Sequence, residues 1–146
     1  MKVIVQRVDT ANVKINNKIV GKIDNGFMLL VGFTHSDDIK DIEYMIKKIL
    51  NLRIFDDENG IMNKNILEVK GSILSISQFT LYADTKKGNR PSYINAMNRE
   101  KATILYDKFN ELLNEKINVQ TGIFGSDMQV TLTNNGPVTI ILDSKE

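Results

Sequence analysis

The chain has 146 residues, a formal net charge of +1 and no cysteine. This length fits one domain, so we take residues 1–146 as a single domain. The lack of cysteine excludes disulfides, thiolate nucleophiles and cysteine-ligated zinc, and it is typical of a cytosolic protein. The small net charge excludes a global basic field, so a nucleic acid would have to meet a local patch of positive charge.

Neither a signal sequence nor a membrane span is expected. Arg7 follows only a few apolar residues. This apolar run is too short to be the apolar region of a signal peptide. No run of about 18 apolar residues occurs, so no segment is expected to cross a membrane. We therefore expect a cytoplasmic protein.

Strand patterns fill the first part of the chain. The paired asparagines at 16–17 predict a hairpin turn, because asparagine tolerates a positive φ. Residues 27–33 are nearly all apolar, which predicts a central strand buried on both faces. The predicted strands here are residues 2–8, 11–15, 18–23 and 27–33.

A first helix is predicted next. Ser36, Asp37 and Asp38 supply a cap and acidic first-turn residues, which favour the positive end of a helix dipole. Apolar residues then recur at spacings of three and four, forming one apolar stripe. The stripe consists of Ile39, Ile42, Ile46, Ile49 and Leu50.

The second half mixes strands with one more helix. A strand is predicted at residues 69–80 that becomes polar at its end, and a Gly-Pro turn is predicted to close a final hairpin. The remaining elements are a loop at 82–91, a helix at 98–114, a strand at 117–121, a Gly-rich turn at 122–127 and hairpin strands at 128–133 and 138–142. This order predicts an α+β domain with a mostly antiparallel, barrel-like sheet and two main helices.

Several kinds of chemistry are disfavoured. The only histidine, His35, lies between a strand end and a helix cap, where a surface or capping role is the ordinary interpretation. Metal sites need clustered ligands, whereas the acids here lie in turns or on helix faces, so no metal is expected. No phosphate-binding glycine motif occurs either. Backbone groups and neutral polar side chains remain, and these can stabilise an oxyanion during hydrolysis of an activated ester.

Two motifs resemble the signatures of the D-aminoacyl-tRNA deacylases. They are Ser-Gln-Phe-Thr-Leu at residues 77–81 and Asn-Gly-Pro-Val-Thr at residues 135–139. Further similar segments follow the same order along the chain: residues 5–8, 48–55, 84–92 and 121–128. Tyr93 stands where many relatives have phenylalanine.

The resemblance implies a homodimeric cytosolic esterase without a cofactor. Its substrates would be D-aminoacyl-tRNA and glycyl-tRNA, cleaved at the ester to the 3′-terminal adenosine; no DNA partner is expected. The peptide bond Gly136-Pro137 would be cis, would reach into the pocket of the partner subunit and would clash with an L side chain. Without the resemblance, an ordinary Gly-Pro hairpin turn is the default interpretation.

The resemblance also assigns the site residues. The catalytic set is Ser77, Gln78, Phe79 and Thr80. The substrate-binding set is Gly136, Pro137, Asn135, Arg7, Phe124 and Met128, with Arg7 holding the Gly-Pro turn through its backbone.

Two roles for the first motif stay open. The Phe79 N–H and neighbouring donors can bind the oxyanion, or the Thr80 hydroxyl can act as a nucleophile. We prefer the first, since no base lies near Thr80 in the sequence to activate it. Ser77 and Thr80 can also simply cap strand-end backbone groups.

A basic loop follows the first motif. Lys86, Lys87 and Arg90 suit contacts with the phosphates of tRNA, although a solvated loop is the alternative. Two other functions remain: a non-catalytic dimeric nucleic-acid-binding module, and an esterase or acyl-transfer enzyme acting on small molecules. The first is disfavoured because no aromatic cluster flanks the basic loop in the sequence.

Overall fold

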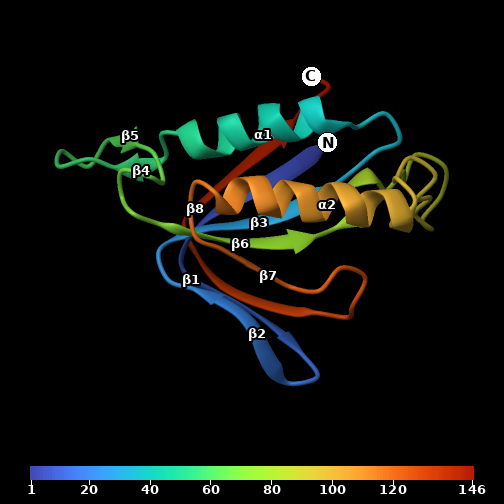
Figure 1. Cartoon of the computed structure of the whole chain (residues 1–146), viewed down its shortest axis with the longest axis horizontal. Helices are drawn as coiled ribbons and strands as arrows, with labels where there is room; N and C mark the ends of the chain where they lie inside the picture. The colour runs from blue at the N-terminus through green and yellow to red at the C-terminus, as the bar shows by residue number, and fades with distance from the viewer.

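The structure, a computed structural model, describes residues 1–146 and consists of one curled sheet with helices against one face (Figure 1). The strand order is β2-β1-β3-β6-β7, with β8 on the other side of β1. The six strands are β1 (Lys2–Ile15), β2 (Lys18–Ile23), β3 (Gly26–Gly32), β6 (Ser72–Ser77), β7 (Val119–Thr121) and β8 (Gln129–Asp143). The α+β class and the barrel-like sheet are as predicted.

One long strand replaces two predicted short ones at the start. Residues 2–8 and 11–15 are both part of β1, which pairs with β3 through its first half and with β2 through its second. Asn16 and Asn17 form the turn to β2 at positive φ, 50° and 64°, as predicted. A single bent strand is favoured because β8 pairs along nearly its whole length.

The predicted hairpin at Gly136-Pro137 is wrong. Residues 128–133 and 138–142 do not pair with each other, since both belong to β8, which runs antiparallel to β1. Between the pairs Gln6–Thr139 and Val8–Asn134, β8 has four intervening residues while β1 has one. The Gly-Pro segment is therefore a bulge in a strand, which local turn chemistry alone cannot distinguish from a hairpin.

The strand predicted at residues 69–80 is shorter than expected. β6 ends at Ser77, and Phe79–Tyr82 forms a 3-10 helix, η1. β6 runs parallel to β3 on one side and to β7 on the other, so this part of the sheet is parallel. A small separate hairpin, β4 (Phe55–Asp56) with β5 (Met62–Lys64), lies after the first helix.

Both helices lie on the same side of the sheet (Figure 1). They are α1 (Ile39–Asn51) and α2 (Arg99–Asn114). Asp38 caps α1 in a capping box with Asp41, and Asn98 caps α2 by accepting from the Lys101 N–H. The start of α1 follows the predicted capping chemistry, and α2 begins next to the predicted residue 98.

The core has two parts, one on each face of the sheet. The larger lies between the sheet and the helices, and the smaller fills the inside of the curl. In β3 the side chains alternate: Phe27 and Leu29 belong to the first cluster and Met28 to the second. This explains why β3 is apolar at nearly every position.

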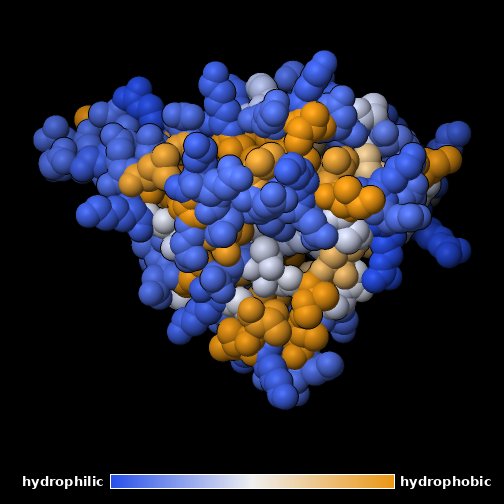
Figure 2. All heavy atoms as spheres, viewed as in Figure 1, coloured by the Kyte–Doolittle hydropathy of each residue, from blue (hydrophilic) through white to orange (hydrophobic).

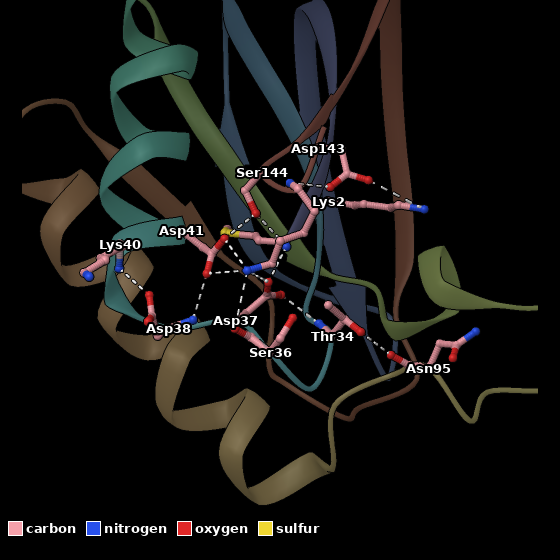
Figure 3. Close-up of polar contacts among 12 residues, drawn as sticks. Lys2, Thr34, Ser36, Asp37, Asp38, Lys40, Asp41, Asn95, Asp143 and Ser144 are labelled. Atoms are coloured by element: carbon pink, nitrogen blue, oxygen red, sulfur yellow. Dashed lines mark hydrogen bonds and ion pairs between the residues drawn. The ribbon is translucent and has the colours of Figure 1, made fainter.

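The two chain ends meet beside α1 (Figure 3). The amino group of Met1 is buried and lies 2.5 Å from Asp37 and 2.8 Å from the Ser144 hydroxyl. Burial by itself would raise the pKa of Asp41, but hydrogen bonds from Ser144, the Asp38 N–H and Lys145 lower it from 3.8 to about 2. These polar contacts fix the start of β1 and the end of β8 against the cap of α1.

Apolar groups are exposed both over the helices and near the end of the molecule formed by β2 (Figure 2). Ile19 and Val20 are exposed in β2. No helix is both long and apolar enough to span a membrane.

Candidate functional site

A pocket of about 300 Å³ opens where β3 and β6 end. Its walls come from the end of β3, the first motif, the start of α2 and the turn before β8. The lining residues are Val31, Gly32, Phe33, Gln78, Phe79, Met97, Arg99, Ala102, Phe124 and Gly125. This volume is at the lower end of small-molecule sites, which suits one nucleoside-sized group.

The first motif forms one wall of this pocket. Ser77 is the last residue of β6 and pairs with Val31, and the Gln78 N–H donates to the Val31 carbonyl at 2.7 Å. The Gln78 side-chain amide donates to the hydroxyl of Thr80. Gln78 is therefore held at both its backbone and its side chain, and Thr80 serves as its acceptor.

Phe79 brings an amide and an aromatic ring to the site. It is the first residue of η1, so its N–H has no acceptor within that helix. Its ring is 53% exposed and packs edge-on against Tyr93, with ring centroids 4.9 Å apart. The expectation that no aromatic cluster flanks the basic loop is therefore wrong, because the fold brings together two rings that lie on either side of that loop in the sequence.

Phe124 also lines the pocket, and its ring rests on a residue of α2. Its ring packs against Tyr106 of α2, with centroids 5.7 Å apart. The Tyr106 hydroxyl donates to the Ser75 carbonyl in β6 at 2.8 Å, and burial raises the pKa of this phenol, so it stays a donor. Met128 does not line the pocket; it packs against the smaller core.

The second motif lies elsewhere in the same chain. The Gly136-Pro137 bond is cis, and both residues are exposed in the bulge of β8. Arg7 donates from Nε to the Asn135 carbonyl at 3.2 Å and from Nη1 to the Ile54 carbonyl at 2.7 Å. Within one chain, the structure therefore brings Arg7, Asn135 and the Gly-Pro pair together, but not with the pocket.

Side chains hold this bulge in a fixed shape. The Asn134 amide donates to the carbonyls of Arg7 and Val138, both at 3.0 Å. The Thr139 hydroxyl donates to the Pro137 carbonyl at 3.1 Å, and the Asn135 amide donates to Asp9 at 2.8 Å. The backbone around Gly136 is therefore exposed to solvent, and the hydrogen bonds of the neighbouring side chains hold it in one conformation.

The basic loop lies between η1 and α2. Lys86, Lys87 and Arg90 are all exposed, and a bridge between Asp84 and Ser92 closes the base of the loop. Downstream, His35 contacts the Ile94 carbonyl at 2.6 Å and the Thr34 hydroxyl donates to the Asn95 carbonyl at 2.6 Å (Figure 3 shows the second contact). His35 therefore has a structural partner at the surface.

Sequence reasoning missed several pocket residues. Arg99 is the only charged residue in the lining, and neither it nor Gly125 was a candidate. One signal for Arg99 was available: a cation at the first position of a helix opposes the helix dipole. No group of three or more His, Cys, Asp or Glu residues is placed to hold a metal ion.

Comparison with known proteins points to one family. The family described as D-Tyr-tRNA(Tyr) deacylase matches residues 4–143. Among solved structures, one described as a c-Myc DNA unwinding element binding protein is similar, with a TM-score of 0.93 and 40% identity over 98% of both chains. Another, described as a probable eukaryotic D-amino acid tRNA deacylase, has a TM-score of 0.82 and 20% identity over 97% of both chains. At this identity the similarity concerns the fold.

Proposed function

The chain belongs to the D-Tyr-tRNA(Tyr) deacylase family, and from this premise we propose that it clears D-amino acids and glycine from tRNA. It is a hydrolase of the aminoacyl ester. Water adds to the ester carbonyl, the bond to the ribose oxygen breaks, and the free amino acid and the tRNA hydroxyl are released. The observation that carries the proposal is the pocket wall made by Gln78 and Phe79.

The pocket stabilises the charge that develops on the ester oxygen. The Phe79 N–H donates to this oxyanion, and one such donor lowers the activation barrier by about 3–4 kcal/mol. Gln78 is held by Val31 and Thr80, so it keeps the ester in one orientation. Thr80 is occupied as an acceptor for Gln78, which supports a positioning role rather than a nucleophilic one.

Chirality is read by a second copy of the chain. In one chain the Gly136-Pro137 bulge lies beside Arg7, which pairs with Phe27, whereas the pocket begins at Val31. Four residues of β3 separate the two positions, roughly 13 Å at the usual rise of a strand. A two-fold partner brings its own bulge to this pocket, where its carbonyls accept the substrate ammonium and its backbone excludes an L side chain.

The exposed loop cations contact the tRNA backbone. Lys86, Lys87 and Arg90 are exposed and close to the first motif in the sequence, which supports contacts with phosphates near the bound 3′ end. The site needs neither cofactor nor metal for this reaction, and the protein works in the cytoplasm where charged tRNA is used.

Deacylation of the two mirror-image substrates tests the function. We expect rapid loss of the ester from D-tyrosyl-tRNA, slow loss from L-tyrosyl-tRNA, and loss from glycyl-tRNA, because glycine has no side chain to exclude. Release of labelled amino acid over time measures all three, with buffer alone as the control. Equal loss of the D and L esters would indicate a non-selective esterase instead.

A binding module is the second candidate, and one observation favours it. Phe79 and Tyr93 form an exposed aromatic pair beside the basic loop, an arrangement that can stack nucleic-acid bases. The same assay decides between the two functions, since a binding module would leave every ester intact.

A further inference from the structure

We propose that Arg99 binds the phosphate on the 5′ side of the terminal adenosine and so selects a nucleotide over a nucleoside ester. This inference rests on the proposed function of the same pocket. Arg99 is the first residue of α2 and lines the pocket together with Gln78 and Phe79. It is the only charged residue among the ten that form the lining.

The Arg99 side chain has no partner in the protein. No hydrogen bond from its guanidinium and no carboxylate within 4.0 Å of it occurs in the structure. The group instead packs against the backbone of Gly125: a Cβ added there would lie 2.5 Å from Nη2 and 2.7 Å from Cζ. A glycine in the left-handed region, at φ +76°, therefore leaves room for the guanidinium at the edge of the pocket.

The position of Arg99 is unfavourable for the helix itself. The N-terminus of α2 carries a partial positive charge, so an arginine there is repelled, typically by a few tenths of a kcal/mol. The cap of the helix is already supplied by Asn98, so the Arg99 side chain is not needed for it. Glu100 in the same first turn offsets part of this repulsion, so the helix tolerates an arginine at its start whose side chain belongs to the pocket lining.

The charge of Arg99 identifies the part of the substrate that it contacts. The substrate carries an ammonium on the amino acid and a phosphate one sugar away from the ester. Arg99 and the helix N-terminus repel the ammonium and attract the phosphate. With the ester at Gln78 and Phe79, the phosphate therefore lies toward Arg99, and the ammonium lies on the other side of the pocket.

Two small substrates isolate this contact. They are the D-tyrosyl esters on the 3′ side of adenosine and of adenosine 5′-monophosphate, which differ only in the 5′-phosphate. For the unmodified protein we expect the phosphate to lower KM roughly tenfold with kcat unchanged, because the contact forms equally before and during the reaction. Arg99→Ala should abolish this preference, and Arg99→Lys should keep part of it because it keeps the charge without the planar fork.

The same contact appears in the salt dependence with tRNA. Arg99→Ala should reduce the slope of log affinity against log salt for a D-aminoacyl-tRNA by about 0.7, the value for one phosphate of a single strand. Lys101→Ala removes a charge from the same helix turn outside the pocket lining, and it should keep the preference for the phosphorylated ester.

Each outcome decides the matter. The inference is overturned if Arg99→Ala keeps the phosphate preference, if Lys101→Ala loses it equally, or if the unmodified protein shows none. Failure of the unmodified protein to hydrolyse any D ester would instead refute the proposed function. Far-UV circular dichroism and the Tm establish that each variant is folded, and Arg99→Gln replaces the alanine variant if that one unfolds.

Discussion

At the scale of single residues, the first motif offers backbone N–H groups and a side-chain amide whose positions are fixed by hydrogen bonds. Gln78 is tied to Val31 by its N–H and to Thr80 by its side chain, and Phe79 presents a helix-start N–H. None of these groups has to change its ionisation state during ester hydrolysis. We therefore propose that the residues of the motif act by holding groups in position.

Replacing Thr80 tests this interpretation directly. We expect Thr80→Ala to keep kcat within about tenfold of the unmodified value, because it removes only the acceptor for the Gln78 amide. Loss of a nucleophile would instead lower kcat by about 10³ or more. Single-turnover hydrolysis of D-tyrosyl-tRNA measures the difference, with Thr131→Ala on the exposed face of β8 as the control.

At the scale of the elements, the parallel pairing of β3 with β6 places the first motif beside the end of β3. The pairing begins where Gly26 lies opposite Ser72 and continues to Val31 opposite Ser77. A Cβ added at Gly26 would lie 1.8 Å from the Ser72 carbonyl oxygen. Only glycine permits this close approach, so the register of the pocket wall depends on it.

A pair of glycine substitutions tests that dependence. Gly26→Ala should lower the free energy of unfolding by about 2–3 kcal/mol, because the methyl group must push the two strands apart. Gly60→Ala should cost only about 1 kcal/mol, since Gly60 is at φ +73° with nothing within 4 Å of the added atom. Urea unfolding measures both, and equal losses would mean that backbone conformation, not close approach, governs Gly26.

At the scale of the whole molecule, the two motifs lie near different ends of β3 within one chain. The pocket lies at one end of β3, and the braced bulge of β8 projects beside Arg7 toward the other end. β8 also carries Ile141, which is 71% exposed beside Ile4 and Leu81.

Mixing two variants, each defective in a different motif, tests whether the site is shared. One chain carries Gln78→Ala with Phe79→Ala, and the other carries Pro137→Ala. Separately, each should be inactive toward D-tyrosyl-tRNA or have lost its preference for the D ester. Unfolded and refolded together, they should recover about a quarter of the unmodified D-specific activity, because half of the dimers are mixed and one of their two pockets is intact.

Controls make the mixing experiment decisive. Each variant refolded alone supplies the baseline, and size-exclusion chromatography with light scattering establishes the oligomeric state. No recovery from a mixture that contains dimers would show that Gly136-Pro137 does not serve the pocket of the other chain.

The sequence by itself determined the elements whose signals are local. Asp38 caps the first helix, and Asn16-Asn17 turns between β1 and β2. The apolar spacing marks the buried Ile42, Ile49 and Leu50, although Ile39 of the predicted stripe is exposed. These features depend on contacts within a few residues, so a linear pattern carries them. The family resemblance likewise followed from short motifs in a consistent order, and the match over residues 4–143 confirms it.

Only the tertiary structure decided which strands pair and which distant residues line the pocket. The Gly136-Pro137 segment has the chemistry of a turn, yet β8 continues through it because β1 offers a partner on both sides of the bulge. Arg99 and Gly125 join the pocket because α2 and the turn before β8 pack beside η1, although they lie far from the first motif in the sequence. Strand pairing and pocket lining are contacts between distant residues, and no local periodicity records them.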